Sequence, residues 1–177
     1  MIERPIFTSN PFNKETSFGA VSAVLTPVGQ FSEEVRRAMC LPDEGVVIEI
    51  HMPKAVKGNG NNNDNKYAGV LGAFSESFGQ IASEAVRWGS EFHSVVAVTH
   101  GIASRTSRRF GFAVKKVSKR HVDSVRLKRA RKGYKLTARY QKGEKKMGPI
   151  FACYQSFEKY MQKFGGRANF VPEEVPS

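Results

Sequence analysis

The stretch LGAFSESFGQIASEAVRWGSEF, residues 71–92, has the most regular apolar pattern in the chain. Its apolar residues are spaced alternately by three and four positions: Leu71, Phe74, Phe78, Ile81, Ala85, Trp88 and Phe92. Because an α-helix turns once every 3.6 residues, this spacing places them all on one side of a helix. We expect a long helix over residues 67–92 that packs this stripe into a core. A homodimer seam is the alternative use of the same stripe.

Segments on either side of this helix predict a sheet, because they are rich in β-branched residues or alternate between apolar and polar positions. Strands are expected at residues 17–25, 46–51, 95–102 and 110–114, and in a hairpin over residues 125–140. Two shorter helices are expected at residues 33–41, after Ser32 as N-cap, and at residues 150–164. The predicted fold is α+β: a mainly antiparallel sheet of five to six strands, with one long and two shorter helices packed on one face.

We expect a single domain over residues 17–166, between a flexible N-terminal arm (1–16) and a C-terminal tail (167–177). Residues 57–65 read KGNGNNNDN and contain no apolar side chain, which predicts a mobile loop within that domain. The chain has no run of about 18 apolar residues, so we expect no membrane-spanning helix. The first eleven residues lack the apolar core of a secretory signal. The expected location is intracellular: cytoplasmic, or nuclear in a eukaryotic host.

The positive charge of the chain is concentrated in one segment. The formal net charge is +12, and residues 104–146 carry 17 Lys and Arg against 2 acidic residues. Residues 1–103 have a net charge of −3, and residues 147–177 have a net charge of zero. Such a density of like charge repels itself unless a polyanion neutralises it. The expected partner is therefore nucleic acid, either RNA or DNA.

The second half of this segment is predicted to form a β-hairpin that turns at Lys132–Gly133. The two-residue turn places Arg126 directly opposite Arg139. Like charges in this position destabilise a hairpin, so the pair suggests a phosphate held between two guanidiniums. Replacing both arginines by glutamate is then expected to leave stability intact and to weaken binding. Tyr134 and Tyr140 either stack on unpaired bases or bury their rings in the core.

The expected function is non-catalytic binding of RNA or DNA, mainly through phosphates and with weak sequence specificity. The expected contact residues are Arg105, Arg108, Arg109, Lys115, Lys116, Lys119, Arg120, Arg126, Lys128, Arg129, Arg131, Lys132, Lys135, Arg139 and Lys142, with Tyr134 and Tyr140. One alternative is an adaptor that docks on an acidic protein, as in virion or ribonucleoprotein particles. The small size and the arm are compatible with a viral protein.

A small metal-dependent nuclease is the second alternative. Pro42–Asp43 followed by Glu49–Ile50–His51 resembles the nuclease pattern Pro-Asp…Glu-x-Lys, in which two carboxylates hold a divalent metal beside a general base. In this hypothesis Asp43 and Glu49 are the metal ligands, and His51 stands where the pattern has lysine. For the binding function no metal or cofactor is expected. The two cysteines are too few for a disulfide framework or the usual cysteine-based zinc site.

Overall fold

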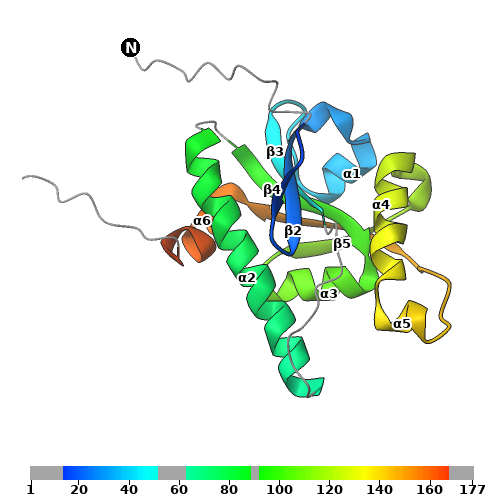
Figure 1. The fold of residues 1–177 in the computed structure, drawn as a ribbon. Coiled ribbons are helices and arrows are strands. Elements are labelled where there is room, and N and C mark those ends of the chain that lie inside the picture. The colour runs from blue at the N-terminus through cyan, green and yellow to red at the C-terminus, as the bar shows by residue number, and fades with distance from the viewer. Residues whose placement is uncertain (1–13, 52–62, 89–91, 168–177) are drawn as a thin grey trace, which may run out of the picture.

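The computed structural model describes residues 14–51, 63–88 and 92–167 (Figure 1). With η denoting a 3-10 helix, the elements are β1 (Thr16–Phe18), β2 (Val21–Pro27), η1 (Val28–Gln30), α1 (Glu33–Ala38), β3 (Val46–His51), α2 (Asn63–Trp88), β4 (Phe92–His100), α3 (Gly101–Arg109), β5 (Ala113–Val117), η2 (Lys119–His121), α4 (Ser124–Lys135), α5 (Ala138–Gln141), β6 (Ile150–Ser156), α6 (Phe157–Phe164) and η3 (Gly165–Arg167). Residues 1–13 of the expected arm, 57–62 of the expected loop and 168–177 of the expected tail lie outside the described residues.

The described strands form one six-stranded sheet in the order β1-β2-β3-β4-β6-β5. Four of its neighbouring pairs are antiparallel, and only β3 and β4 run parallel. A parallel pair needs a crossover connection, and α2 lies in the connection between β3 and β4. The prediction of an α+β fold with a mainly antiparallel sheet of five to six strands is confirmed.

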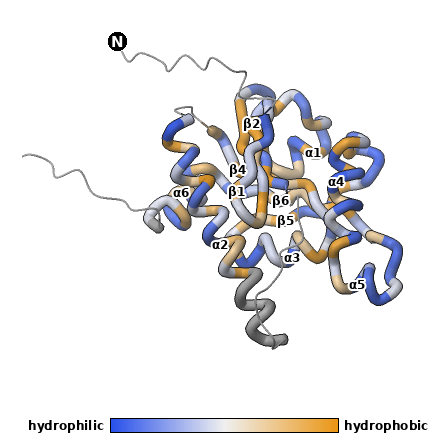
Figure 2. The backbone as a smooth tube through the Cα atoms, in the orientation of Figure 1, coloured by the Kyte–Doolittle hydropathy of each residue, from blue (hydrophilic) through white to orange (hydrophobic). Residues whose placement is uncertain are grey.

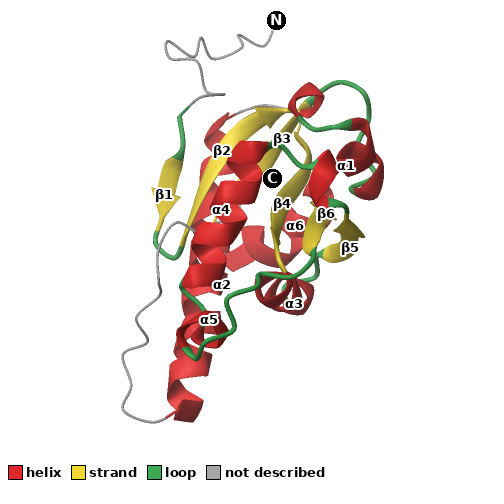
Figure 3. Ribbon diagram, turned by 90° about the vertical axis from the view of Figure 1, so that its right-hand side faces the viewer, coloured by secondary structure: helices red, strands yellow, loops and turns green. Residues whose placement is uncertain are grey.

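The helices cover both faces of the sheet, and the prediction that they pack on one face is wrong. Ile48 and Val95 belong to one core cluster, together with residues of α2 and α6. Their strand neighbours Val47 and Val96 belong to a second cluster, with residues of α1 and α4. Figure 1 shows α2 and α4 on opposite sides of the strands, and Figure 3 views the sheet from the α4 side. Burial on both faces accounts for the nearly continuous apolar run of β3.

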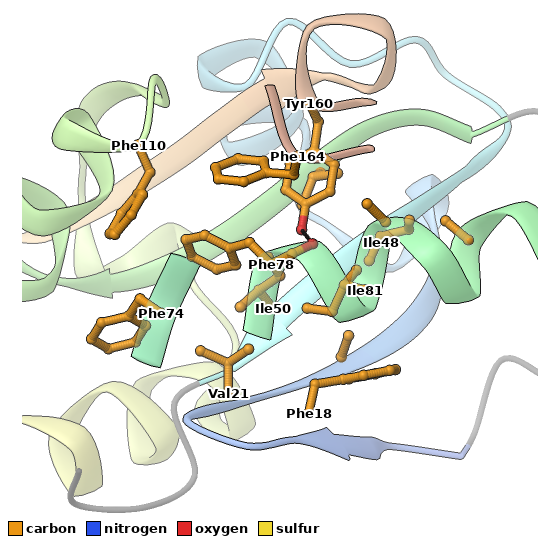
Figure 4. Packing of buried hydrophobic residues seen from close by; sticks show 14 of the residues in the cluster. Phe18, Val21, Ile48, Ile50, Phe74, Phe78, Ile81, Phe110, Tyr160 and Phe164 are labelled. Carbon is orange, nitrogen blue, oxygen red and sulfur yellow. Dashed lines mark hydrogen bonds between the residues drawn. The ribbon is translucent and has the colours of Figure 1, made fainter. Parts of the chain in front are cut away.

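The predicted apolar stripe of α2 packs against the sheet. Phe74, Phe78, Ile81 and Ala85 are all buried in the first core cluster. Figure 4 shows the α2 side chains beside those of β3, and Tyr160 of α6 donates a hydrogen bond from its hydroxyl to the Phe78 carbonyl at 2.7 Å. Because this core already uses the stripe, it is not available as the dimer seam. The helix begins at Asn63, inside the expected loop, and ends at Trp88, so that Phe92 opens β4.

The predicted hairpin over residues 125–140 is wrong, because these residues form α4 and α5. The Asp123 carboxylate accepts a hydrogen bond from the Arg126 backbone N–H at 3.0 Å and so caps α4. Ala130 and Tyr134, four residues apart, supply the buried side of the helix. Arg126 and Arg139 therefore do not face each other across two strands.

The segment expected as the start of the last helix, residues 150–156, is strand β6, and the helix begins at Phe157. β6 lies between β4 and β5, and its residues Ile150, Ala152 and Cys153 are fully buried. Pairing on both edges outweighs the helical spacing of the aromatic residues in this segment.

Candidate functional site

Six charged or titratable side chains gather around Glu49 of β3, and because this central carboxylate is buried we call the group the buried ion cluster, although Glu15, Asp123 and Arg129 at its margin are exposed. Its members are Glu15, Glu49, His51, Asp123, Arg126 and Arg129. Glu49 is 2% exposed, and the Arg126 guanidinium donates to both of its carboxylate oxygens, from Nε at 2.7 Å and from Nη2 at 2.8 Å. The Thr26 hydroxyl donates a further bond to Glu49 at 2.9 Å.

These contacts set the charge state of Glu49. Burial alone would raise its pKa, but hydrogen bonds from His51 and Arg126, together with the Arg126 charge, lower the pKa from 4.5 to about 2. Burial would lower the pKa of Arg126, and its bonds to Glu49 and Asp123 raise it instead. The guanidinium also lies 4.1 Å from the centre of the Phe31 ring. Arg126 is therefore mostly buried and is held by the carboxylates of Glu49 and Asp123.

Arg129 also contacts members of the buried ion cluster. Its Nη2 lies 3.4 Å from a carboxylate oxygen of Glu15, and its Nη1 lies against the His51 ring. Two of the expected contact residues, Arg126 and Arg129, are thus paired with carboxylates of their own chain. Their role as nucleic-acid contacts stays a prediction.

The structure brings together two of the three residues of the nuclease hypothesis. His51 Nε2 lies 3.2 Å from a carboxylate oxygen of Glu49. Asp43 precedes β3, and its fully exposed carboxylate lies 3.6 Å from Arg36. Arg126 already occupies the Glu49 oxygens that a metal would need. Within residues 14–51, 63–88 and 92–167, no group of three His, Cys, Asp or Glu side chains is arranged to hold a metal ion.

A second feature, which we call the basic pocket, lies where α3 and α5 meet residues 144–149. It is a hollow of about 360 Å³. Among the described residues, four cationic side chains and one carboxylate lie in its wall. The described lining is Gly101, Ile102, Ser104, Arg105, Arg108, Tyr134, Arg139, Glu144, Lys146, Met147, Gly148, Pro149 and Phe151. This arrangement gives the hollow an excess of three positive charges.

Local structure explains why these cations converge. Arg105 and Arg108 are three residues apart on α3 and therefore share one side of the helix. Thr137 caps α5 by accepting a hydrogen bond from the Tyr140 backbone N–H at 3.4 Å, which positions Arg139 on that short helix. The Tyr134 hydroxyl donates to the Glu144 carbonyl at 2.9 Å and holds the segment that carries Lys146 against α4.

Within the described part of the chain, the positive charge of the basic pocket is only weakly neutralised. Arg139 lies 3.9 Å from Glu144, beyond hydrogen-bond distance, and both side chains are about half exposed. Arg105 and Arg108 are exposed, and neither forms an ion pair with a carboxylate of the described residues. Guanidinium groups present forked N–H donors that match two oxygens of a phosphate. The pocket is therefore suited to a phosphate or another small anion.

The other expected contact residues are exposed but lie outside the basic pocket. They are Arg109 at the end of α3, Lys115 and Lys116 on β5, Lys119 and Arg120 on η2, Lys128, Arg131, Lys132 and Lys135 on α4, and Lys142 after α5. Figure 2 shows hydrophilic residues along α4 and α5, on the side of the molecule that carries the basic pocket.

Of the two tyrosines, Tyr134 is buried and offers no free face for base stacking, whereas Tyr140 is half-buried. Tyr134 is 3% exposed and its ring packs against Tyr140, which lies under the Lys145 ammonium at 3.9 Å. Sequence reasoning also missed Lys146 as a site residue. It belongs to the basic segment, but the contact between Tyr134 and residue 144 that brings it to the pocket has no signature in the sequence.

No family model, curated protein or solved structure matches this chain. The basic pocket and the buried ion cluster are therefore the observations from which a function is inferred. Among the described residues, none of the helices combines the length and the apolar character that crossing a bilayer requires.

Proposed function

We propose that this protein binds nucleic acid, RNA or DNA, through phosphate contacts centred on the basic pocket, without catalysing a reaction on it. The observation that carries this proposal is the convergence of Arg105, Arg108, Arg139 and Lys146 on one hollow, in which Glu144 is the single carboxylate among the described residues. Folding alone gains nothing from such a cluster, because like charges repel one another.

The surroundings of the pocket support a polymeric anion over a small one. Exposed cations also lie on α4, which contributes Tyr134 to the pocket wall, and on η2 and β5. A chain of phosphates has more candidate partners on these elements than a single small anion does. The half-buried Phe151 at the pocket wall offers an apolar contact for a sugar or a base edge. Phosphate contacts of this kind position a nucleic acid without reading its sequence, so weak specificity follows.

The charge of the pocket predicts a measurable salt dependence. If six to eight cations engage duplex DNA, log K should fall against log salt with a slope of about −5 to −7. The double variant Arg105→Gln/Arg108→Gln should lose about two phosphate contacts. Its slope should be shallower by about 2, and its affinity should be weaker by roughly 30-fold at 0.1 M salt. Fluorescence anisotropy with labelled single- and double-stranded DNA and RNA measures both quantities.

A matched control removes the same charge elsewhere. Arg87 on α2 and Lys159 on α6 are exposed and lie outside the basic pocket. The variant Arg87→Gln/Lys159→Gln should keep nearly the wild-type slope and affinity. Equal losses in the two double variants would show that only the net charge matters, and would overturn the assignment to the pocket. A wild-type protein without affinity for any of the four nucleic acids would overturn the proposed function and favour an acidic protein partner.

A further inference from the structure

The positive charge of the basic pocket exceeds what one internal phosphate of a nucleic acid neutralises. Its four cations stand against one carboxylate among the described residues of the lining. A phosphate within a strand is a diester with a single negative charge. A phosphate at the end of a strand is a monoester, which carries about −1.5 to −2 charges at neutral pH and has three acceptor oxygens. The charge of the pocket therefore favours a phosphate monoester over a diester.

The shape of the pocket favours the end of a strand as well. The pocket is a hollow of about 360 Å³, and pockets that enclose small molecules span about 300–1,000 Å³. Its wall combines residues of α3 and α5, the segment 144–149 and Phe151 of β6. An internal phosphate has a nucleotide on each side, so the strand must both enter and leave such a hollow. A strand end places a single nucleotide in it.

The N-terminal end of α3 adds to the positive potential of the pocket. Gly101 and Ile102, the first two residues of this nine-residue helix, belong to the lining. A helix dipole places partial positive charge at this end, which favours an anion there. Arg105 and Arg108 lie about one and two turns further along the same helix. The guanidinium groups and the helix dipole therefore act on the same space.

Phe151 connects the pocket to a further cation outside it. Its ring lies beside the start of α3, where a Cβ atom at Gly101 would be 3.4 Å from the ring atom Cε2. Lys116 of β5 is the direct strand partner of Phe151, so the two side chains share one face of the sheet. Lys116 is exposed and lies outside the lining of the pocket. A strand whose end fills the pocket therefore finds a cation for its next phosphate, whereas a free phosphate does not use it.

We propose that the basic pocket binds the terminal phosphate of a nucleic-acid strand, with the phosphate oxygens on Arg105 and Arg108 and the terminal nucleoside against Phe151. This inference rests on the proposed function and specifies which part of the nucleic acid enters the pocket. The wall also contains the carboxylate of Glu144. A carboxylate accepts hydrogen bonds from hydroxyl and amino groups, so it suits the nucleoside and not the phosphate.

Single-stranded RNA and DNA of one sequence test the proposal, each with a 5′-phosphate, a 3′-phosphate or hydroxyl groups at both ends, and with an internal fluorophore. A hydroxyl-ended strand that is one nucleotide longer is the control, because it contains as many phosphates as the phosphorylated strand. In fluorescence anisotropy with the full chain, at least one phosphorylated form should bind about tenfold more tightly than this control.

The two double variants locate this preference on the protein. Arg105→Gln/Arg108→Gln should bind the phosphorylated and control strands almost equally, and Arg87→Gln/Lys159→Gln should keep the wild-type ratio. All four side chains are exposed, so both variants should fold, which circular dichroism verifies. Because the ratio is taken within each variant, it is independent of a general loss of affinity. A preference that survives the loss of Arg105 and Arg108 would overturn the assignment to the pocket.

Three further results would count against the proposal. Equal binding of all forms by the wild type would overturn the terminal-phosphate inference and leave the proposed function intact, whereas no binding of any form would overturn both. Adenosine 5′-monophosphate has the same phosphate monoester without a strand, so it should displace the phosphorylated strand only at much higher concentration. Displacement at equal concentration would assign the pocket to free nucleotides and overturn the inference of a strand end.

Discussion

Replacing Arg126 by methionine is expected to destabilise the protein by about 3–5 kcal/mol, because the Glu49 carboxylate then remains in the core without its cation. The pKa of Glu49, held at about 2 by these contacts, gives a similar figure of about 3 kcal/mol for the stabilisation of the charged form at neutral pH. Urea unfolding followed by circular dichroism measures the loss. This expectation reverses the earlier one, in which Arg126 faced a like charge and was dispensable for folding.

The double variant Glu49→Met/Arg126→Met is the control, and it should recover most of the lost stability, since two apolar side chains of similar volume often replace a buried ion pair without loss. The pH adds a second check. In the wild type, Glu49 stabilises the fold above pH 4.5, and this contribution is lost as the pH falls through 2. In Arg126→Met, burial instead favours the neutral acid, so the deficit should shrink on acidification. A single variant as stable as the wild type would refute the structural role of the pair.

The second large effect concerns His100 and mild acid. Burial lowers the pKa of its imidazole from 6.5 to about 4, so the unfolded chain binds this proton more readily than the folded one. The stability that neutral His100 contributes is complete above pH 6.5 and is lost as the pH falls through 4. The loss amounts to about 3 kcal/mol. Denaturation series between pH 7 and pH 4 measure it.

His100→Asn should flatten this dependence, because asparagine does not titrate and still caps α3. His93 provides the matched control, since it lies on the same strand, β4, with an exposed side chain. His93→Asn should retain the wild-type loss between pH 6.5 and pH 4. If the His100 variant loses as much stability as the wild type over this interval, the acid sensitivity arises elsewhere in the molecule.

Local patterns predicted the parts of the fold that depend on near neighbours. β3 was expected at residues 46–51 and spans Val46–His51. Ser32 was expected to cap the helix that begins at residue 33, and its hydroxyl accepts a hydrogen bond from the Val35 backbone N–H at 3.3 Å. The predicted apolar stripe of α2 is confirmed over residues 71–88, because one face of that helix packs against the sheet. In each case the residues that determine the structure lie within a few positions of one another.

The hairpin prediction was wrong because the side-chain pattern of residues 125–140 fits both the two-residue period of a strand and the 3.6-residue period of a helix. Val125, Leu127 and Arg129 alternate as in a strand, but Ala130 and Tyr134 have helical spacing and Asp123 provides the cap. Arg, Lys, Leu and Ala all favour a helix, so propensity and capping together outweigh the short alternation.

The candidate site was predictable in its general position but not in its detail. The charge distribution correctly placed the cations that line the basic pocket within residues 104–146. The basic residues counted in this segment also include Arg126, whose ion-pair partner Glu49 is 77 residues away in the sequence. Only the packing of α4 against the sheet, mainly on β4, brings Arg126 to Glu49 and leaves other arginines available to a ligand.

The place of β5 at the edge of the described sheet gives part of the basic segment a different role. An outermost strand offers unsatisfied backbone groups to any other strand that approaches, and ammonium side chains on such a strand discourage that pairing. Two of the five residues of β5 are lysines, Lys115 and Lys116, and both are exposed. These two charges therefore oppose edge-to-edge aggregation in crowded solution, whatever ligand the rest of the surface binds.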